Sequence, residues 1–114
     1  TLHALAPGKA MLAALPGAEL DRYFAQARLE RFTPSTLTGE AKLRKELAEV
    51  RKTGFAIADE ELSLGINGIG HVVAMDGEVI GALSVAIPKV RWDDELVARA
   101  KDLLLRTAGL LEAG

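Results

Sequence analysis

The chain has 114 residues, of which 49% are hydrophobic and 26% are charged, a composition typical of one folded domain and unlike that of a disordered segment. The formal net charge is −2, so no basic surplus marks these residues as a nucleic-acid-binding surface. There is no cysteine, which excludes disulfides, thiolate zinc sites and cysteine nucleophiles; together with the lack of a signal-peptide pattern and of a membrane-length apolar run, this favours the cytoplasm.

Three helices are expected in the N-terminal half. Pro7 suits the first turn of a short apolar helix over residues 7–15, because its missing N–H would be unpaired there anyway. A second helix is predicted over residues 17–26 from apolar residues at helical spacing. A third, amphipathic helix is predicted to start at an N-cap on Thr38 and to end before Gly54. Its mixed charges are those of a solvated face.

From residue 55 onward the apolar pattern changes to the period of strands. Three strands are predicted, with the sequences FAIA, GIGHVVAM and EVIGALSVAI (residues 55–58, 68–75 and 78–87). Asp76-Gly77 predicts a type I′ hairpin turn between the last two, because such a turn needs positive φ at both central positions. Acidic residues from Asp93 then begin a final helix with a broad apolar face.

The order of the elements predicts an α+β fold, with an antiparallel sheet and flanking helices. Three strands are few for four helices, so we expect further strands of the domain to precede Thr1 and the chain to be a fragment. Four leucines of the final helix are expected to pack mainly within the domain and in part against another subunit: Leu103, Leu104, Leu110 and Leu111.

The acidic triplet Asp59-Glu60-Glu61 allows three interpretations: a metal site, a general acid/base pair, or a loop whose carboxylates cap backbone amides. A metal site lacks ligands, because only His3 and His71 are available and neither has the spacing of a zinc motif. Catalysis would need one carboxyl with a raised pKa in a pocket, which a sequence does not show. We favour the capping role.

Four patterns occur in register along the chain: His3 with Gly8-Lys9-Ala10, Thr33 with Thr36, Arg51 to Glu61, and Ala82 to Val85. In this order the chain resembles the effector-binding domain of the IclR-type bacterial transcription regulators over essentially its whole length. The resemblance implies a GAF/profilin-like α+β domain that binds a small organic or aromatic acid, without catalysis, cofactor or metal. It also implies a homodimer or homotetramer, and an N-terminal winged helix-turn-helix that contacts DNA and is absent from residues 1–114.

The resemblance also implies an effector pocket between the first helix and one face of the sheet. The implied effector-binding residues are Ala6, Pro7, Gly8, Met11, Ala58, Asp59, Ile66, Gly68, Ser84 and Ala86. Residues two apart on a strand share a face, which fits the pair 66 and 68 and the pair 84 and 86. Backbone amides at a helix start suit a carboxylate. We interpret Lys9 as a solvated residue that contributes its amide rather than its ammonium, and His71 as facing away from the pocket.

Two departures from the family pattern make this pocket less polar and favour an effector with a larger apolar body. Ala58 stands where some relatives have an aspartate, and Ala86 lacks a hydroxyl. A rival from another class, a small enzyme on the same scaffold such as a sulfoxide reductase, would use cysteines, which the chain lacks. The other alternative is a ligand-free oligomerisation module with a collapsed pocket; bulky side chains at Ala6, Gly68 or Ala86 would favour it, and the chain has small ones.

Overall fold

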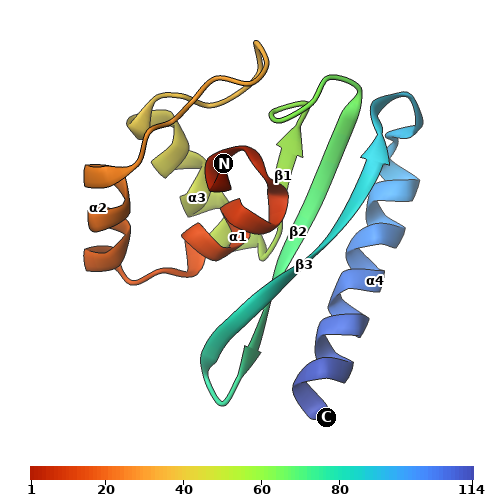
Figure 1. Cartoon of the computed structure of the whole chain (residues 1–114). Coiled ribbons are helices and arrows are strands. Elements are labelled where there is room, and N and C mark those ends of the chain that lie inside the picture. Colours follow the sequence, from red (N-terminus) through yellow and green to blue (C-terminus); the bar gives the residue numbers. More distant parts are fainter.

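The computed structural model describes all of residues 1–114 and contains four α-helices, two short 3₁₀ helices and three strands. In chain order the elements are η1 (Leu2–Ala4), α1 (Ala6–Ala14), α2 (Gly17–Gln26), α3 (Glu40–Thr53), β1 (Ala56–Asp59), β2 (Ile66–Met75), β3 (Glu78–Pro88), η2 (Lys89–Arg91) and α4 (Asp94–Ala113). Three helices, three strands and a last helix confirm the predicted α+β class (Figure 1).

The strands form one antiparallel sheet in the order β1–β2–β3. Asp76 and Gly77 have φ angles of 51° and 81°, which confirms the left-handed turn predicted between β2 and β3. In the register of these two strands Gly68 lies opposite Ala86, so small residues meet on one face of the sheet. β3 is an edge strand, with no neighbour on its outer side.

The helices are divided between the two faces of the sheet (Figure 1). α1 and α3 share one hydrophobic core with the even-numbered positions of the strands, and α2 adds Leu20 to it. This core consists of Ala10, Leu12, Ala13, Leu20, Leu43, Leu47, Val50 and Ala56. On the opposite face α4 packs against odd-numbered positions, in a smaller core of Ile69, Ile87, Ala100 and Leu104. Strand alternation therefore decides which residues can reach the α1 side.

The start of α3 differs from the prediction. The helix begins at Glu40 after Gly39, which has no side chain to act as a cap. The hydroxyl of Thr38 instead accepts a hydrogen bond from Arg31 Nη2 at 3.1 Å. The predicted end is confirmed: Gly54 adopts φ +86°, a left-handed conformation that favours glycine at the end of a helix.

The start of α1 lies very close to β2. A methyl group added at Gly70 would be 2.5 Å from the carbonyl oxygen of Ala6, and one added at Gly68 would be 3.1 Å from Ala6 Cβ. Glycine permits this approach because it has no Cβ. The two glycines therefore fix how near α1 can sit to the sheet, and with it the size of the space between them.

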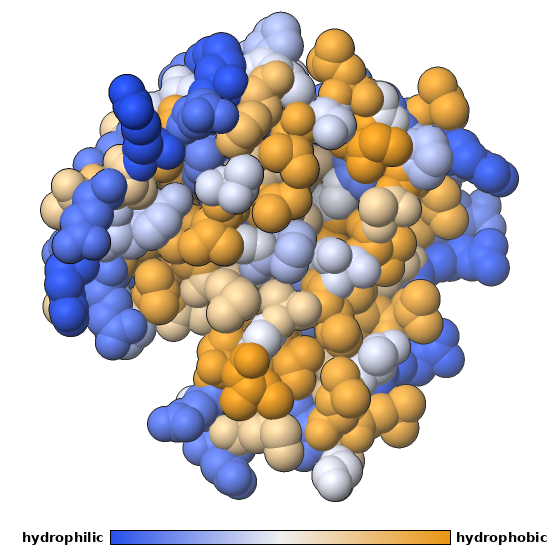
Figure 2. Space-filling model, in the orientation of Figure 1, coloured by the Kyte–Doolittle hydropathy of each residue, from blue (hydrophilic) through white to orange (hydrophobic).

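Apolar side chains cover much of the surface seen in Figure 2, with hydrophilic residues gathered at its margins. Of the four leucines singled out on α4, only Leu104 is buried; Leu103, Leu110 and Leu111 are exposed, so packing within residues 1–114 does not account for most of them. This outcome differs from the expectation and leaves an apolar stripe on the outer side of α4. No helix combines the length and apolar content needed to cross a bilayer.

Candidate functional site

A cavity of about 190 Å³ lies between the start of α1 and the face of the sheet that carries the small residues. Its walls come from η1 and the start of α1, from β1 and the loop after it, and from the facing parts of β2 and β3. Seven of the ten residues expected at the effector pocket line it: Ala6, Pro7, Ala58, Ile66, Gly68, Ser84 and Ala86. The structure thus brings together residues up to 80 positions apart in the chain.

The other three expected residues do not line this cavity. Gly8 is buried in α1 beneath the backbone of Leu2. Met11 lies on the outer side of α1 and is 39% exposed, because the buried Ala10 faces the core instead. Asp59 is also outside, at the end of β1, where its Oδ1 accepts a hydrogen bond from the ammonium of Lys89 at 2.6 Å. Sequence spacing alone did not show which way these residues face.

Lys9 is buried, contrary to the expectation of a solvated residue. Its side chain has no exposed surface. The ammonium donates to the carbonyl oxygen of Ile57 at 2.6 Å and to Glu61 Oε1 at 3.0 Å, and it lies 2.5 Å from Glu46 Oε2. These partners belong to β1, to the loop after it and to α3. Because a buried charge is tolerated only when it is paired, this ammonium holds the three segments together.

Two carboxylates of the acidic triplet cap backbone amides, as expected. Glu60 Oε1 accepts from the N–H of Gly65 at 2.8 Å, and Glu61 Oε2 accepts from the N–H of Asp59 at 3.0 Å. Burial raises the pKa of Glu61 above its ordinary value, and attraction to the Lys9 ammonium offsets only part of this rise. The triplet therefore shapes the loop beside the cavity, and Glu61 is the member that lines it.

Two buried threonines fix the backbone of the same loop. Thr33 Oγ1 donates to the carbonyl oxygen of Glu60 at 2.6 Å, and Thr36 Oγ1 donates to that of Glu61 at 2.5 Å. Thr36 Oγ1 also accepts from the backbone N–H groups of Thr33 and Phe32. The Thr-x-x-Thr pattern is therefore a clamp on the cavity wall, made from a segment far away in the sequence.

We expect the substitution Thr36→Val to lower the free energy of unfolding by about 1–3 kcal/mol, since it keeps the shape but leaves buried polar groups without a partner. Thr38→Val is the matched control: it removes a hydroxyl that bonds only to Arg31, whose guanidinium keeps two carbonyl partners, and should change stability by less than about 0.5 kcal/mol. Urea unfolding of both variants measures the difference. Equal effects would show that the buried hydroxyl is not needed for the clamp.

Neither histidine lies in the cavity wall. His3 Nε2 is 2.8 Å from the carbonyl oxygen of Glu30, and His71 Nδ1 is 2.7 Å from that of Gly54. The ring of His71 packs against Phe55, on the face of the sheet turned away from Gly68, as expected. No group of three or more side chains of the kinds that hold a metal comes together.

Seven residues that line the cavity were not predicted from the sequence: Ala4, Leu5, Glu61, Leu62, Ser63, Asn67 and Val85. Three of these, Glu61 to Ser63, form the loop after β1, which the sequence indicated only as a capped turn. No sequence signal identified Glu61 as a lining residue, because a lysine and a glutamate that pair across 52 residues give no periodic pattern. The loop is the part of the site that only the fold revealed.

Comparison with known families gives a match over residues 1–112 to the C-terminal domain of the bacterial transcriptional regulator IclR. Among curated proteins, the chain is 35% identical over 114 residues to the HTH-type transcriptional regulator BhcR of Paracoccus denitrificans, an alignment that covers 99% of this chain and 41% of BhcR. The chain therefore spans less than half the length of this relative.

Solved structures share the fold. The C-terminal domain of the E. coli regulator KdgR is 28% identical with a TM-score of 0.93, over 98% of this chain and 69% of that one. The inducer-binding domain of the transcription factor PobR from Acinetobacter, a double mutant in complex with 3-hydroxybenzoic acid, is 29% identical with a TM-score of 0.90, over 97% of this chain and 65% of that one. Family match, sequence identity and fold agree. The chain thus belongs to the IclR family of bacterial transcription regulators, as the C-terminal effector-binding domain, and is not an enzyme.

Proposed function

We propose that the cavity under α1 is the effector site of a regulator, and that it takes a small organic or aromatic acid. The observation that supports this most is the wall itself: small side chains at Ala6, Ala58, Gly68 and Ala86 leave an apolar space beside the start of a helix. A complex of the related PobR domain with 3-hydroxybenzoic acid supports the same class of ligand. The acid would then modulate promoter binding by a winged helix-turn-helix in the same protein.

Regulation of this kind depends on a difference in affinity. An effector shifts the equilibrium between two arrangements of the DNA-binding domains only by as much as it binds them unequally, typically by about 1–3 kcal/mol. The buried Lys9 joins the cavity loop to α3, so a change at the wall reaches the outer surface of the domain through a direct ion pair with Glu46. The proposal places the regulator in the cytoplasm, beside the DNA.

We further propose that residues 1–114 form part of a larger effector-binding domain whose remaining strands extend the sheet from β3. The outer edge of β3 is unpaired, and Ser84 and Ala86 on this strand are exposed although they line the cavity. A long unpaired edge is a liability that proteins usually cover. A strand placed there would close the cavity on its open side. The exposed leucines of α4 favour a homodimer or homotetramer as the assembled form.

Thermal unfolding of the purified protein at its full natural length tests the proposed site against small carboxylic and aromatic acids with neutral analogues. One acid is expected to raise the midpoint saturably, because a ligand at 100 times its Kd stabilises the folded state by about 2.7 kcal/mol. Ser84→Leu should abolish the rise by filling the cavity, whereas Ser35→Leu, an exposed position away from it, should not. If no acid shifts the midpoint, the domain is better described as a ligand-free oligomerisation module.

A further inference from the structure

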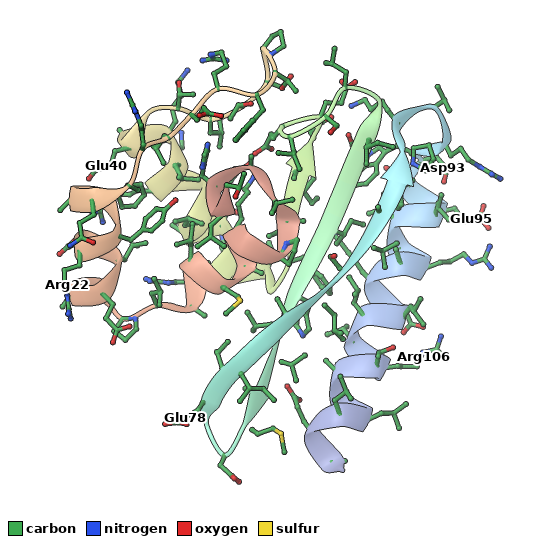
Figure 3. All side chains as sticks on the ribbon, viewed as in Figure 1. Arg22, Glu40, Glu78, Asp93, Glu95 and Arg106 are labelled. Carbon is green, nitrogen blue, oxygen red and sulfur yellow. The ribbon has the colours of Figure 1, made fainter.

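The ionisable side chains that line the cavity are unusual for a site proposed to bind an acid. Among its lining residues one side chain is ionisable, and that side chain is an acid, Glu61. No lysine, arginine or histidine lines the wall. Charged residues such as Arg22, Glu40 and Arg106 extend outward from the helices at the margins of the molecule (Figure 3). The wall therefore offers no cationic side chain to pair with a carboxylate.

Lys9 does not supply the missing positive charge. An ammonium has three N–H donors, and three groups surround that of Lys9: the Ile57 carbonyl and the carboxylates of Glu61 and Glu46. Its side chain has no exposed surface and is not part of the cavity wall. A ligand carboxylate could reach it only by displacing one of these partners. The ion cluster as a whole holds two carboxylates against one ammonium, so its net charge is negative.

Glu61 still has capacity to accept a hydrogen bond. A carboxylate has about four lone-pair sites, and the donors found on Glu61 are the Lys9 ammonium and the backbone N–H of Asp59. A ligand hydroxyl or N–H group would fit this acceptor. A ligand carboxylate beside it would instead face a like charge in a partly desolvated place.

We propose that Glu61 determines the specificity and orientation of the effector by accepting a hydrogen bond from a hydroxyl group, so that the effector is a hydroxylated acid. Its carboxylate then lies away from Glu61, toward Ser84 and the start of α1. This inference rests on the proposed effector site and adds which substituent of the ligand, a hydroxyl group, the site recognises. Its physical basis is that a hydrogen bond to a charged acceptor is stronger than one between neutral groups.

The other polar residues of the wall do not provide the same selection. Ser63 and Ser84 carry hydroxyls, which both donate and accept, and therefore do not distinguish a hydroxyl from an ether on a ligand. Asn67 lies on the same face of β2 as Ile69, opposite to Gly68, and its Oδ1 already accepts from the N–H of Glu60. We therefore assign to Glu61 the discrimination against a ligand that lacks a hydrogen-bond donor.

The test measures the affinity of the full-length protein for matched acids by calorimetry: 3-hydroxybenzoic, benzoic and 3-methoxybenzoic acid, and lactic and propionic acid. At least one hydroxylated acid is expected to bind about ten- to a hundredfold more tightly than its partner without the hydroxyl, and the methoxy analogue should lose this gain. In Glu61→Gln, which keeps the size and removes the charge, the preference for the hydroxyl should fall to within about threefold.

Glu46→Gln is the matched control, because it removes the other carboxylate beside Lys9 from a position outside the cavity wall. It should keep the preference for the hydroxyl. If Glu46→Gln and Glu61→Gln erase the preference equally, the effect comes from the ion cluster, and the assignment of a direct contact is wrong. If acids bind without any preference for the hydroxyl, the effector site stands and this inference falls. If no probe binds, both fall.

Discussion

Replacing Lys9 by methionine is expected to lower the free energy of unfolding by about 3–5 kcal/mol, as is typical when one partner of a buried ion pair is removed. The loss arises because Glu61, whose side chain is 6% exposed, keeps its burial but loses the ammonium that compensates it. Methionine has a similar length, so the change removes charge rather than volume. Lys45→Met on the exposed face of α3 is the control and should change stability by less than about 0.5 kcal/mol.

The deficit of Lys9→Met is also expected to depend on pH. Without Lys9 the pKa of Glu61 in the folded protein rises further, since burial and repulsion from Glu46 remain. A carboxyl with a raised folded-state pKa binds its proton more readily in the folded state, so the stability falls as pH rises from the unfolded-state value of 4.5 through the folded-state value. The variant should therefore recover part of its stability relative to the wild type as pH is lowered toward 4.5.

Denaturant unfolding of both proteins at several pH values measures this recovery. The double variant Lys9→Met with Glu61→Gln should regain part of the lost stability at neutral pH and should lack the pH-dependent deficit. A deficit that stays constant over this pH range would show that lost packing, and not an unpaired carboxylate, causes the instability.

Gly70→Ala is expected to destabilise the protein by about 3 kcal/mol and to weaken binding at the cavity. The added methyl group would lie 2.5 Å from the carbonyl oxygen and 2.6 Å from the carbonyl carbon of Ala6, atoms of the backbone that no change of rotamer can move. α1 must therefore shift away from β2, and its first turn carries part of the cavity wall. Both stability and acid binding depend on this one close approach.

Gly81→Ala on β3 is the matched control. A methyl group there meets no atom within 4 Å, and alanine reduces the freedom of the unfolded chain, so stability should stay the same or rise slightly. Unfolding curves and the affinity of the best acid in each variant check both expectations. If Gly70→Ala is as stable as Gly81→Ala, α1 does not approach the sheet as closely as described.

Structural features that depend only on residues close together in the sequence were predicted correctly. The hairpin at Asp76-Gly77 and the end of α3 at Gly54 follow from backbone conformations that few residue types adopt easily. The division of the sheet into two faces follows from strand alternation, which places Gly68 and Ala86 on the cavity side and His71 on the other. The start of α3 was predicted wrongly: the hydroxyl of Thr38 does not cap the helix but accepts a hydrogen bond from Arg31, seven residues away.

The sequence by itself determined the α+β class, the order of the elements and most of the small residues that face the cavity, because helix and strand periods are set by local geometry. Only the tertiary structure decided that Lys9 is buried, that Glu61 lines the cavity, and that Met11 faces outward. The reason is physical: a buried ion pair forms only when folding brings together groups 52 residues apart, and its partners leave no period in the sequence.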